Sequence, residues 1–362
     1  MIKLLIVDDS ALMRRQLSAM FDAEPDFEIR LARNGREAVE ENRNFQPDVI
    51  TLDINMPEMD GLTALSLIMA DRPVAVVMIS SLTEKGALAT FEALNLGAID
   101  YVVKPGGTIS LAIDTIRATV VSKVRIAAKA RLKPVRPSAV PSSPLAPSPQ
   151  AVRQPVLVTA PSGAMPRKES GREGVVIIGV STGGPRTLEL ILPRLPAKFP
   201  WPVLVAQHMP ASFTQSFAQR MNAICAMEVV EANRPMALEA GTIYIAKGGA
   251  DMQVVRRAGK LNVIAKPETA EFLWHPSVEL LGRSVLEHVP CANVLGIMLT
   301  GMGNDGAEAF TAIKKRGGRT IAESEESCVV FGMPAELIKQ GGATVTLHAE
   351  KIAAQVNAWL EC

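Results

Sequence analysis

A proline-rich stretch near the middle of the chain divides it into two parts that must fold separately. Nine of the 25 prolines lie between Pro134 and Pro166, among serines and alanines and with almost no aromatic residues. Such a segment favours an extended spacer over a packed layer. The chain of 362 residues also exceeds the size at which one hydrophobic core ordinarily stops growing. We therefore predict two domains, over residues 1–125 and 173–362, joined by a linker over residues 126–172.

Both parts alternate short β-branched runs with amphipathic helical stretches, a pattern typical of parallel α/β sheets. The expected strands of the first part are Leu4–Val7, Phe27–Leu31, Val49–Leu52, Val74–Ile79 and Tyr101–Val103. Those of the second part are Val175–Ile178, Val203–Ala206, Thr242–Ile245, Val294–Leu299 and Thr320–Ala322. We predict an α/β protein in which a flavodoxin-like domain is linked to a doubly wound parallel-sheet domain. Ligands should then bind beyond the carboxyl ends of the strands.

The balance of charge and the apolar runs exclude several classes of protein. The chain has 38 Lys and Arg against 37 Asp and Glu, so it lacks the basic footprint of a nucleic-acid binder. No apolar run approaches the roughly 18 residues of a membrane span. Acidic residues follow the first strand before the apolar stretch of a signal peptide could develop. No C-x-x-C spacing occurs among Cys225, Cys291, Cys328 and Cys362, so neither disulfides nor zinc are expected. We expect a soluble, cytoplasmic protein without membrane insertion.

Charged residues end several of the expected strands in the first domain. Asp8 and Asp9 end the first strand and Asp53 ends the third. Lys104 ends the fifth, so parallel strands would bring all four residues to one edge of the sheet. Close carboxylates repel unless a cation lies among them, and such oxygen ligands suit Mg²⁺. Each Asp could instead be a helix N-cap or a solvated loop end. Lys104 and the hydroxyl of Ser80 would reach a phosphoryl group on Asp53.

The motifs VDDS, LDINMPEMDG, VVMISS and YVVKP make residues 1–125 resemble the receiver domain of two-component response regulators. The resemblance implies transfer of a phosphoryl group from a histidine kinase to Asp53. The Mg²⁺ ligands that it implies are Asp8, Asp9, Asp53 and the backbone carbonyl of Asn55. The switch residues that it implies are the hydroxyl of Ser80, the rotating aromatic ring of Tyr101 and the phosphate-sensing cation Lys104.

In the second domain, the first expected strand runs into the pentapeptide GVSTG, residues 179–183. Glycines allow positive φ, so the hydroxyl of Ser181 can stand clear of the sheet while N–H groups point toward a developing oxyanion. The same turn is compatible with a phosphate-binding loop or with Ser181 as an ordinary helix N-cap. A P-loop is disfavoured because no Lys follows the glycines, and the G-x-G-x-x-G of a nucleotide-binding oxidoreductase is incomplete.

A nucleophilic serine needs a base, and the chain has only four histidines: His208, His275, His288 and His348. His208 directly follows an expected strand in VAQHMP, at the same sheet edge as Ser181. Asp305 follows a strand and a glycine-rich turn and is expected to open a helix, where an Asp is often simply an N-cap. With Asp305 on one ring nitrogen and Ser181 on the other, His208 would be oriented for general-base catalysis.

The segments IIGVSTGGP, VAQHMP, HPSVE, LTGMGNDGAEA and SCVVFGMP resemble the catalytic domain of bacterial chemotaxis protein-glutamate methylesterases. The resemblance implies hydrolysis of γ-glutamyl methyl esters on the cytoplasmic helices of chemoreceptors, with release of methanol, and deamidation of receptor glutamines. It implies that Ser181 is the nucleophile, His208 the base and Asp305 the orienting acid, without a cofactor in this domain. Val180 departs from the alanine that is common at its position.

Further roles follow from the same resemblance. Met302 is a candidate oxyanion donor through its backbone N–H, and His275 and Ser277 are expected to line the substrate groove. Regulation is a separate hypothesis, motivated by an Asp-centred switch that a spacer tethers to an active-site edge. The unphosphorylated first domain would lie over that groove, and phosphorylation of Asp53 would shift the equilibrium between the two states. The alternative from another class is a non-enzymatic response regulator whose output domain binds a partner or DNA. No recognition-helix pattern or basic patch after the linker supports DNA binding.

Overall fold

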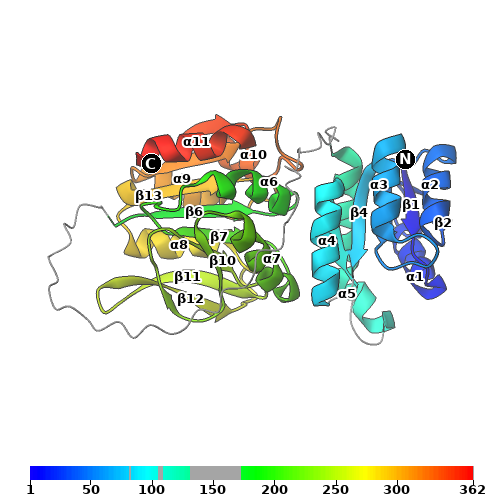
Figure 1. The fold of residues 1–362 in the computed structure, drawn as a ribbon, viewed down its shortest axis with the longest axis horizontal. Helices are drawn as coiled ribbons and strands as arrows, with labels where there is room; N and C mark the ends of the chain where they lie inside the picture. Colours follow the sequence, from blue (N-terminus) through cyan, green and yellow to red (C-terminus); the bar gives the residue numbers. More distant parts are fainter. Residues whose placement is uncertain (81–82, 105–108, 131–172, 362) are drawn as a thin grey trace, which may run out of the picture.

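The computed structural model describes residues 1–80, 83–104, 109–130 and 173–361, and the first domain is built on a parallel sheet (Figure 1). Its strands are β1 (Ile2–Val7), β2 (Phe27–Ala32), β3 (Val49–Asp53), β4 (Ala75–Ser80) and β5 (Asp100–Val103). Its helices are α1 (Ala11–Asp22), α2 (Gly35–Asn44), α3 (Gly61–Asp71), α4 (Glu84–Leu96) and α5 (Ile109–Lys129). The strand order β2-β1-β3-β4-β5 is the flavodoxin-like order and confirms the predicted fold class.

The alternation of side chains along β1 explains how the first sheet is covered on both faces. Leu4 and Ile6 belong to one buried cluster with residues of α1 and α5, whereas Leu5 and Val7 belong to another with residues of α2, α3 and α4. All four side chains are fully buried. A parallel strand buried on both faces is apolar throughout, which is why these runs were recognisable in the sequence.

The second domain is built on a larger parallel sheet. Its strands are β6 (Val175–Val180), β7 (Val203–Gln207), β8 (Glu228–Ala232), β10 (Thr242–Ala246), β13 (Val294–Met298), β14 (Arg319–Glu323) and β15 (Val345–Leu347). They lie in the order β15-β14-β13-β6-β7-β10-β8, and every pairing within the sheet is parallel. From β6 the chain continues to β7 on one side, and from β13 it continues to β14 on the other. The sheet is therefore doubly wound as predicted, with its switch point between β6, which Ser181 directly follows, and β13.

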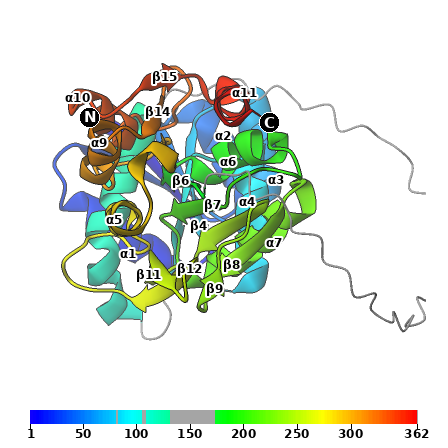
Figure 2. The same cartoon turned by 90° about the vertical axis from the view of Figure 1, so that its left-hand side faces the viewer.

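Helices cover both faces of this sheet (Figures 1 and 2). They are α6 (Gly184–Ile191), α7 (Ala211–Ile224), α8 (Val278–His288), α9 (Ala307–Lys315), α10 (Met333–Lys339) and α11 (Ala349–Leu360), with short 3₁₀ turns η1 (Leu192–Arg194) and η2 (Cys291–Asn293). Val176 and Ile178 of β6 share a buried cluster with residues of α6, α7 and α11. Val175 and Ile177 share the opposite cluster with residues of α8, α9 and α10.

Several elements were not predicted from the sequence. A small antiparallel sheet combines β9 (Met236–Ala237), β11 (Ala250–Arg257) and β12 (Lys260–Pro267), and β8 and β15 extend the large sheet at its two edges. Helix α5 continues to Lys129, past the predicted boundary at residue 125. The rest of the predicted linker, residues 131–172, lies outside the described residues. Among the described residues, none of the helices combines the length and the hydropathy needed to cross a bilayer.

The two domains meet along α4 and β5 of the first and α7 of the second, and Figure 1 shows α4 facing α7. The rings of Tyr101 and Phe213 are stacked, with centroids 4.9 Å apart and planes 7° apart. Phe91 of α4 lies against Phe213 and Phe217, at 6.0 and 5.5 Å between centroids. All four rings are buried, so the domains share a continuous apolar contact.

Candidate active site

Ser181 and His208 lie side by side at the carboxyl edge of the second sheet. The register pairs Val180, the last residue of β6, with Gln207, the last residue of β7. Ser181 directly follows the first strand and His208 directly follows the second. The backbone N–H of His208 donates to the carbonyl of Val180 at 3.1 Å. The buried amide of Gln207 donates to the carbonyl oxygens of both Ser181 and His208, at 3.0 and 3.1 Å. Gln207, which the sequence analysis did not single out, therefore ties the two turns together.

His208 is hydrogen-bonded to Asp305, as the sequence predicts. The distance from His208 Nε2 to Asp305 Oδ2 is 2.9 Å, and the two side chains are 8% and 5% exposed. A carboxylate only accepts hydrogen bonds, so Nε2 carries the proton of this bond. Nδ1 is buried and has no hydrogen-bond partner among the described residues. In a neutral imidazole that nitrogen is the proton acceptor, which is what a general base requires.

The carboxylate of Asp305 is also held by the start of α8. It accepts the backbone N–H groups of Val278 and Glu279, at 2.7 and 2.9 Å, and the hydroxyl of Ser277 at 3.1 Å. Burial raises the pKa of Asp305, but the hydrogen bonds from His208 and from these backbone groups outweigh it and hold the pKa below its ordinary value. Asp305 therefore stays ionised beside His208.

Asp305 does not open its own helix in the way that the sequence predicts. Helix α9 begins at Ala307, and its N-cap is Gly306, with φ at +86°. The side chain of Asp305 turns away from α9 and instead caps α8, which is why that side chain is only 5% exposed. Gly183 precedes α6 with φ at +80°, and a Cβ there would lie 2.6 Å from Val329. Glycine is required at this position both for the backbone conformation and for the close approach.

The structure does not join all the predicted catalytic groups. In the described part of the chain, no hydrogen bond connects the hydroxyl of Ser181 with His208. Catalytic hydrogen bonds in a substrate-free enzyme are often long and tighten only in the complex. Ser277 is fully buried, so it does not line an open groove as expected, and it supports Asp305 instead. Both ring nitrogens of His275 are engaged, Nδ1 with Asp251 at 2.9 Å and Nε2 with the carbonyl of Phe272 at 3.1 Å.

The acidic cluster of the first domain is assembled as predicted. Carboxylate oxygens of Asp8, Asp9 and Asp53 lie within 4.8 Å of one another. Lys104 Nζ is 3.0 Å from Asp8 and 2.9 Å from Asp53. Burial raises the pKa of Asp53 even though Lys104 opposes the shift. Burial alone would lower the pKa of Lys104, but the two carboxylates raise it overall. Three hard oxygen donors at one sheet edge fit the ligand preference of Mg²⁺, and Asn55 follows Asp53 by two residues.

The predicted switch residues Ser80 and Tyr101 lie in the buried core of the first domain. The hydroxyl of Ser80 donates to the carbonyl of Gly86 at 3.2 Å and accepts from Thr90 at 2.8 Å. Burial and the neighbouring Asp100 raise the pKa of Tyr101 well above its ordinary value. The Tyr101 hydroxyl has no partner among the residues that the structure describes, and its ring faces the second domain.

Two polar contacts connect the first domain with the turns around Ser181. The hydroxyl of Thr182 donates to Asp100 of β5 at 2.6 Å, and Lys123 of α5 donates to the same carboxylate at 3.0 Å. The hydroxyl of Ser122 donates to the sulfur of Met302 at 3.3 Å. The sequence analysis did not single out Asp100 and Thr182, because nothing local in the sequence marks a contact between residues 82 positions apart.

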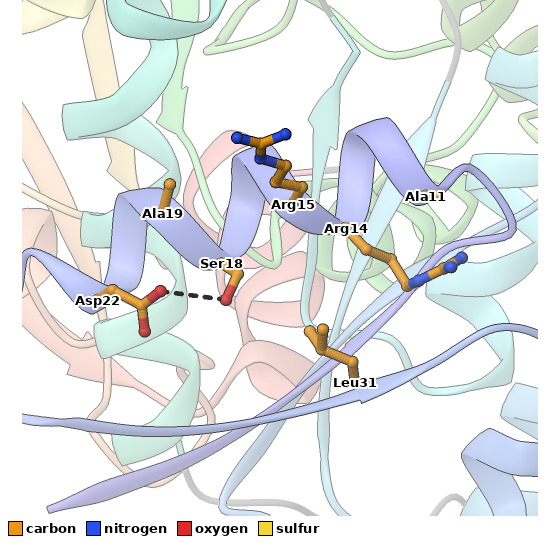
Figure 3. A pocket seen from close by; sticks show the side chains of 7 residues that line it. All are labelled: Ala11, Arg14, Arg15, Ser18, Ala19, Asp22 and Leu31. Carbon is orange, nitrogen blue, oxygen red and sulfur yellow. Dashed lines mark hydrogen bonds between the residues drawn. The ribbon is translucent and has the colours of Figure 1, made fainter.

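A shallow hollow of about 470 Å³ lies along α1, far in sequence from these turns. Figure 3 shows Arg15 pointing away from the side chains of Ser18 and Asp22, which are joined by a hydrogen bond of 3.2 Å. The residues that line the hollow are Ala11, Arg14, Arg15, Ser18, Ala19, Asp22 and Leu31. None of the predicted site residues lies among them, so this hollow is not the predicted active site.

Comparisons with known proteins agree with both resemblances. Residues 176–356 match the family described as CheB methylesterase, and residues 4–114 match the response regulator receiver domain. A protein-glutamate methylesterase/protein-glutamine glutaminase of Rhodospirillum rubrum is 54% identical over 99% of this chain and 96% of its own length. A protein of the same name from Rhodopseudomonas palustris is 49% identical over 99% of this chain and 98% of its own length.

A solved structure extends the agreement to three dimensions. The CheB methylesterase catalytic domain of Thermotoga maritima is 36% identical, covers 52% of this chain and 98% of its own, and superposes with a TM-score of 0.50. The order of the domains, the doubly wound sheet and the paired His208 and Asp305 are thus accompanied by full-length sequence similarity. The chain belongs to the protein-glutamate methylesterase/protein-glutamine glutaminase family, as a response regulator receiver domain followed by a CheB methylesterase domain.

Proposed function

We propose that this protein hydrolyses glutamate methyl esters on the cytoplasmic helices of chemoreceptors by a Ser181–His208–Asp305 triad. The observation that carries the proposal is the pairing of His208 with Asp305 directly beside Ser181. His208 presents one nitrogen without a partner among the described residues, and the buried Asp305 fixes the other. A serine, an oriented imidazole and a buried carboxylate are the groups that acyl transfer needs. The relatives' names add the ester of a protein glutamate as the substrate.

The reaction proceeds in two halves. In the first, Ser181 Oγ forms a bond to the ester carbonyl carbon while its proton passes to His208. The tetrahedral oxyanion is stabilised by N–H groups of the turns, for which the backbone of Met302 is our candidate. The carbon–oxygen bond to the methoxy group then breaks, and methoxide leaves as methanol with the proton from His208.

The second half regenerates the enzyme. Water attacks the glutamyl-enzyme with His208 as the base, and the glutamate carboxylate is released while Ser181 recovers its proton. Deamidation of a receptor glutamine follows the same steps, with ammonia leaving in place of methanol. None of these steps requires a cofactor in the second domain.

The receiver domain supplies the control. We propose that a histidine kinase donates a phosphoryl group to Asp53, with breakage of the phosphorus–nitrogen bond and formation of an acyl phosphate. Mg²⁺ held by Asp8, Asp9, Asp53 and the carbonyl of Asn55 would offset the negative charge during the transfer. Lys104 would then contact the phosphoryl oxygens, and Ser80 would donate its hydroxyl to them.

The contacts between the domains suggest how phosphorylation reaches the active site. Strand β5 carries Asp100 and Tyr101, and Lys104 follows it directly. Asp100 bonds Thr182, the neighbour of Ser181, and Tyr101 stacks on Phe213. A phosphoryl group of about −1.5 to −2 charges draws Lys104 away from its present bridge to Asp8 and Asp53. The proposed result is a shift of β5 that weakens the domain contact and opens the groove.

A non-enzymatic output domain is the alternative function. It would leave unexplained why a buried carboxylate orients an imidazole beside Ser181. Methanol release from methylated receptor membranes decides between the two. We expect release by the unphosphorylated chain and faster release with a small-molecule phosphodonor. Absence of methanol under both conditions would reject the esterase, and equal rates would reject the regulation.

A further inference from the structure

The indole of Trp274 lies flat against the imidazole of His208. The ring centroids are 5.4 Å apart, and the ring planes differ by 3°. Trp274 comes from the loop between β12 and α8, which is remote in sequence from β7. It is half-buried, whereas the side chain of His208 beneath it is only 8% exposed. The indole is therefore part of what separates the base from water.

The position of Trp274 is fixed from both sides. A Cβ on Gly303 would lie 2.7 Å from the indole, and φ at Gly303 is +86°, so the turn before Asp305 passes directly against the ring. On the other side, the neighbouring His275 is bonded to Asp251, which is 1% exposed. Asp251 also accepts the backbone N–H of Ser277 at 2.8 Å. A buried carboxylate thus anchors the loop that carries the indole.

We propose that Trp274 is a positioning residue for His208, an inference that rests on the proposed roles of Ser181 and His208. The stacked indole blocks rotation of the imidazole, so Nε2 stays on Asp305 while Nδ1 stays available to Ser181. When His208 takes the serine proton it becomes a cation, and the face of an indole attracts a cation more strongly in a desolvated site. This second effect arises only once the proton has moved, so it stabilises the transition state more than the ground state.

A fluorophosphonate probe tests this role without the receptor. Ser181 Oγ bonds to phosphorus, fluoride leaves, and the hydroxyl proton passes to His208, so the labelling rate reports how well the serine is activated. In the full chain with a phosphodonor present, we expect Trp274→Leu to lower the labelling rate about tenfold, and Trp274→Phe to recover most of that loss. Trp274→Met replaces the leucine variant if the latter does not fold. Leu273→Ala is the matched control from the same loop, with a side chain that is 79% exposed.

Methanol release separates positioning from substrate binding. Trp274→Leu should lower kcat and leave KM within about threefold of the wild-type value. The inference is overturned if Trp274→Leu labels at the wild-type rate, if phenylalanine rescues nothing, or if only KM rises, which would make Trp274 a receptor contact. A wild-type chain that is not labelled at Ser181 rejects the proposed function itself, so the two failures are distinguishable.

Discussion

The hydroxyl of Thr182 donates a hydrogen bond of 2.6 Å to the carboxylate of Asp100, which ties the neighbour of Ser181 to the receiver domain. The contact is buried, with Thr182 8% and Asp100 5% exposed. It lies beside the stacked rings of Tyr101 and Phe213. One strand of the receiver thus touches the turn that presents the predicted nucleophile.

Removal of the Asp100 carboxylate should weaken the contact that holds the receiver domain against the catalytic domain. We expect Asp100→Ala to raise the rate of methanol release without phosphodonor at least about tenfold, since hydrogen bonds to charged groups contribute about 1.5 to 3 kcal/mol and the lower figure corresponds to about tenfold. Asp71→Asn is the control, because Asp71 pairs with Arg43 on an exposed part of the receiver. An unchanged or lower basal rate in Asp100→Ala would show that this contact does not restrain the enzyme.

Removal of divalent cations should abolish the regulation by the first domain and leave the basal activity of the second domain unchanged. A chelator is expected to abolish the stimulation of methanol release by a phosphodonor, because the carboxylates of Asp8, Asp9 and Asp53 need a cation for phosphoryl transfer. The basal rate should stay unchanged, and added Mg²⁺ should restore the stimulation. A chelator that lowers the basal rate would argue for a metal in the catalytic domain.

Asp305 should make the stability of the catalytic domain depend on acid pH. Its pKa lies below the ordinary value of 3.8, so its ionised form stabilises the fold above the unfolded pKa, and this contribution is lost as pH falls through the folded pKa. The difference in unfolding free energy between wild type and Asp305→Asn should be constant near neutral pH and shrink below about pH 4.

Tryptophan fluorescence during urea unfolding measures this difference, because Trp201, Trp274 and Trp359 all lie in the second domain. Glu308→Gln is the control, with a side chain that is 75% exposed. A difference that persists unchanged to pH 2 would contradict the assignment. The same Asp305→Asn variant should also lose about 10⁴-fold in kcat if Asp305 holds the tautomer of His208.

Gly303 should be intolerant of a side chain for two separate reasons. An alanine there meets the positive φ of +86° and the indole of Trp274, whereas at Gly317 φ is +92° with open space around it. We expect Gly317→Ala to cost about 1 kcal/mol and Gly303→Ala about 2 to 3 kcal/mol. Equal losses in urea unfolding would mean that the indole yields freely and does not clamp the turn.

The sequence was sufficient to predict all the parallel strands except β8 and β15. Strands such as β1 and β6 are buried on both faces over most of their length, so their sequences, IKLLIV and VVIIGV, are almost entirely apolar. β8, with the sequence EVVEA, carries acids at an edge of the sheet, and β11 and β12 are charged where their hairpin faces water. Their apolar signal is weaker, and the sequence analysis did not find them.

The candidate site, like the fold, could be predicted from the sequence only in part. The placement of Ser181, His208 and Asp305 near one another could be predicted, because parallel strands bring their carboxyl ends to one edge. The capping of α8 by Asp305 and the stacking of Trp274 on His208 depend on loops that meet only in the folded chain. No local pattern marks such contacts, which leaves them outside what residue spacing can predict.

The most direct test of the account is methanol release from methylated receptor membranes by the phosphorylated chain, compared with its Ser181→Ala variant. We expect the variant to be slower by about 10⁶-fold, the scale seen when the nucleophile of a serine protease is removed. Retention of more than a few per cent of the wild-type rate would contradict the assignment of Ser181 as the nucleophile.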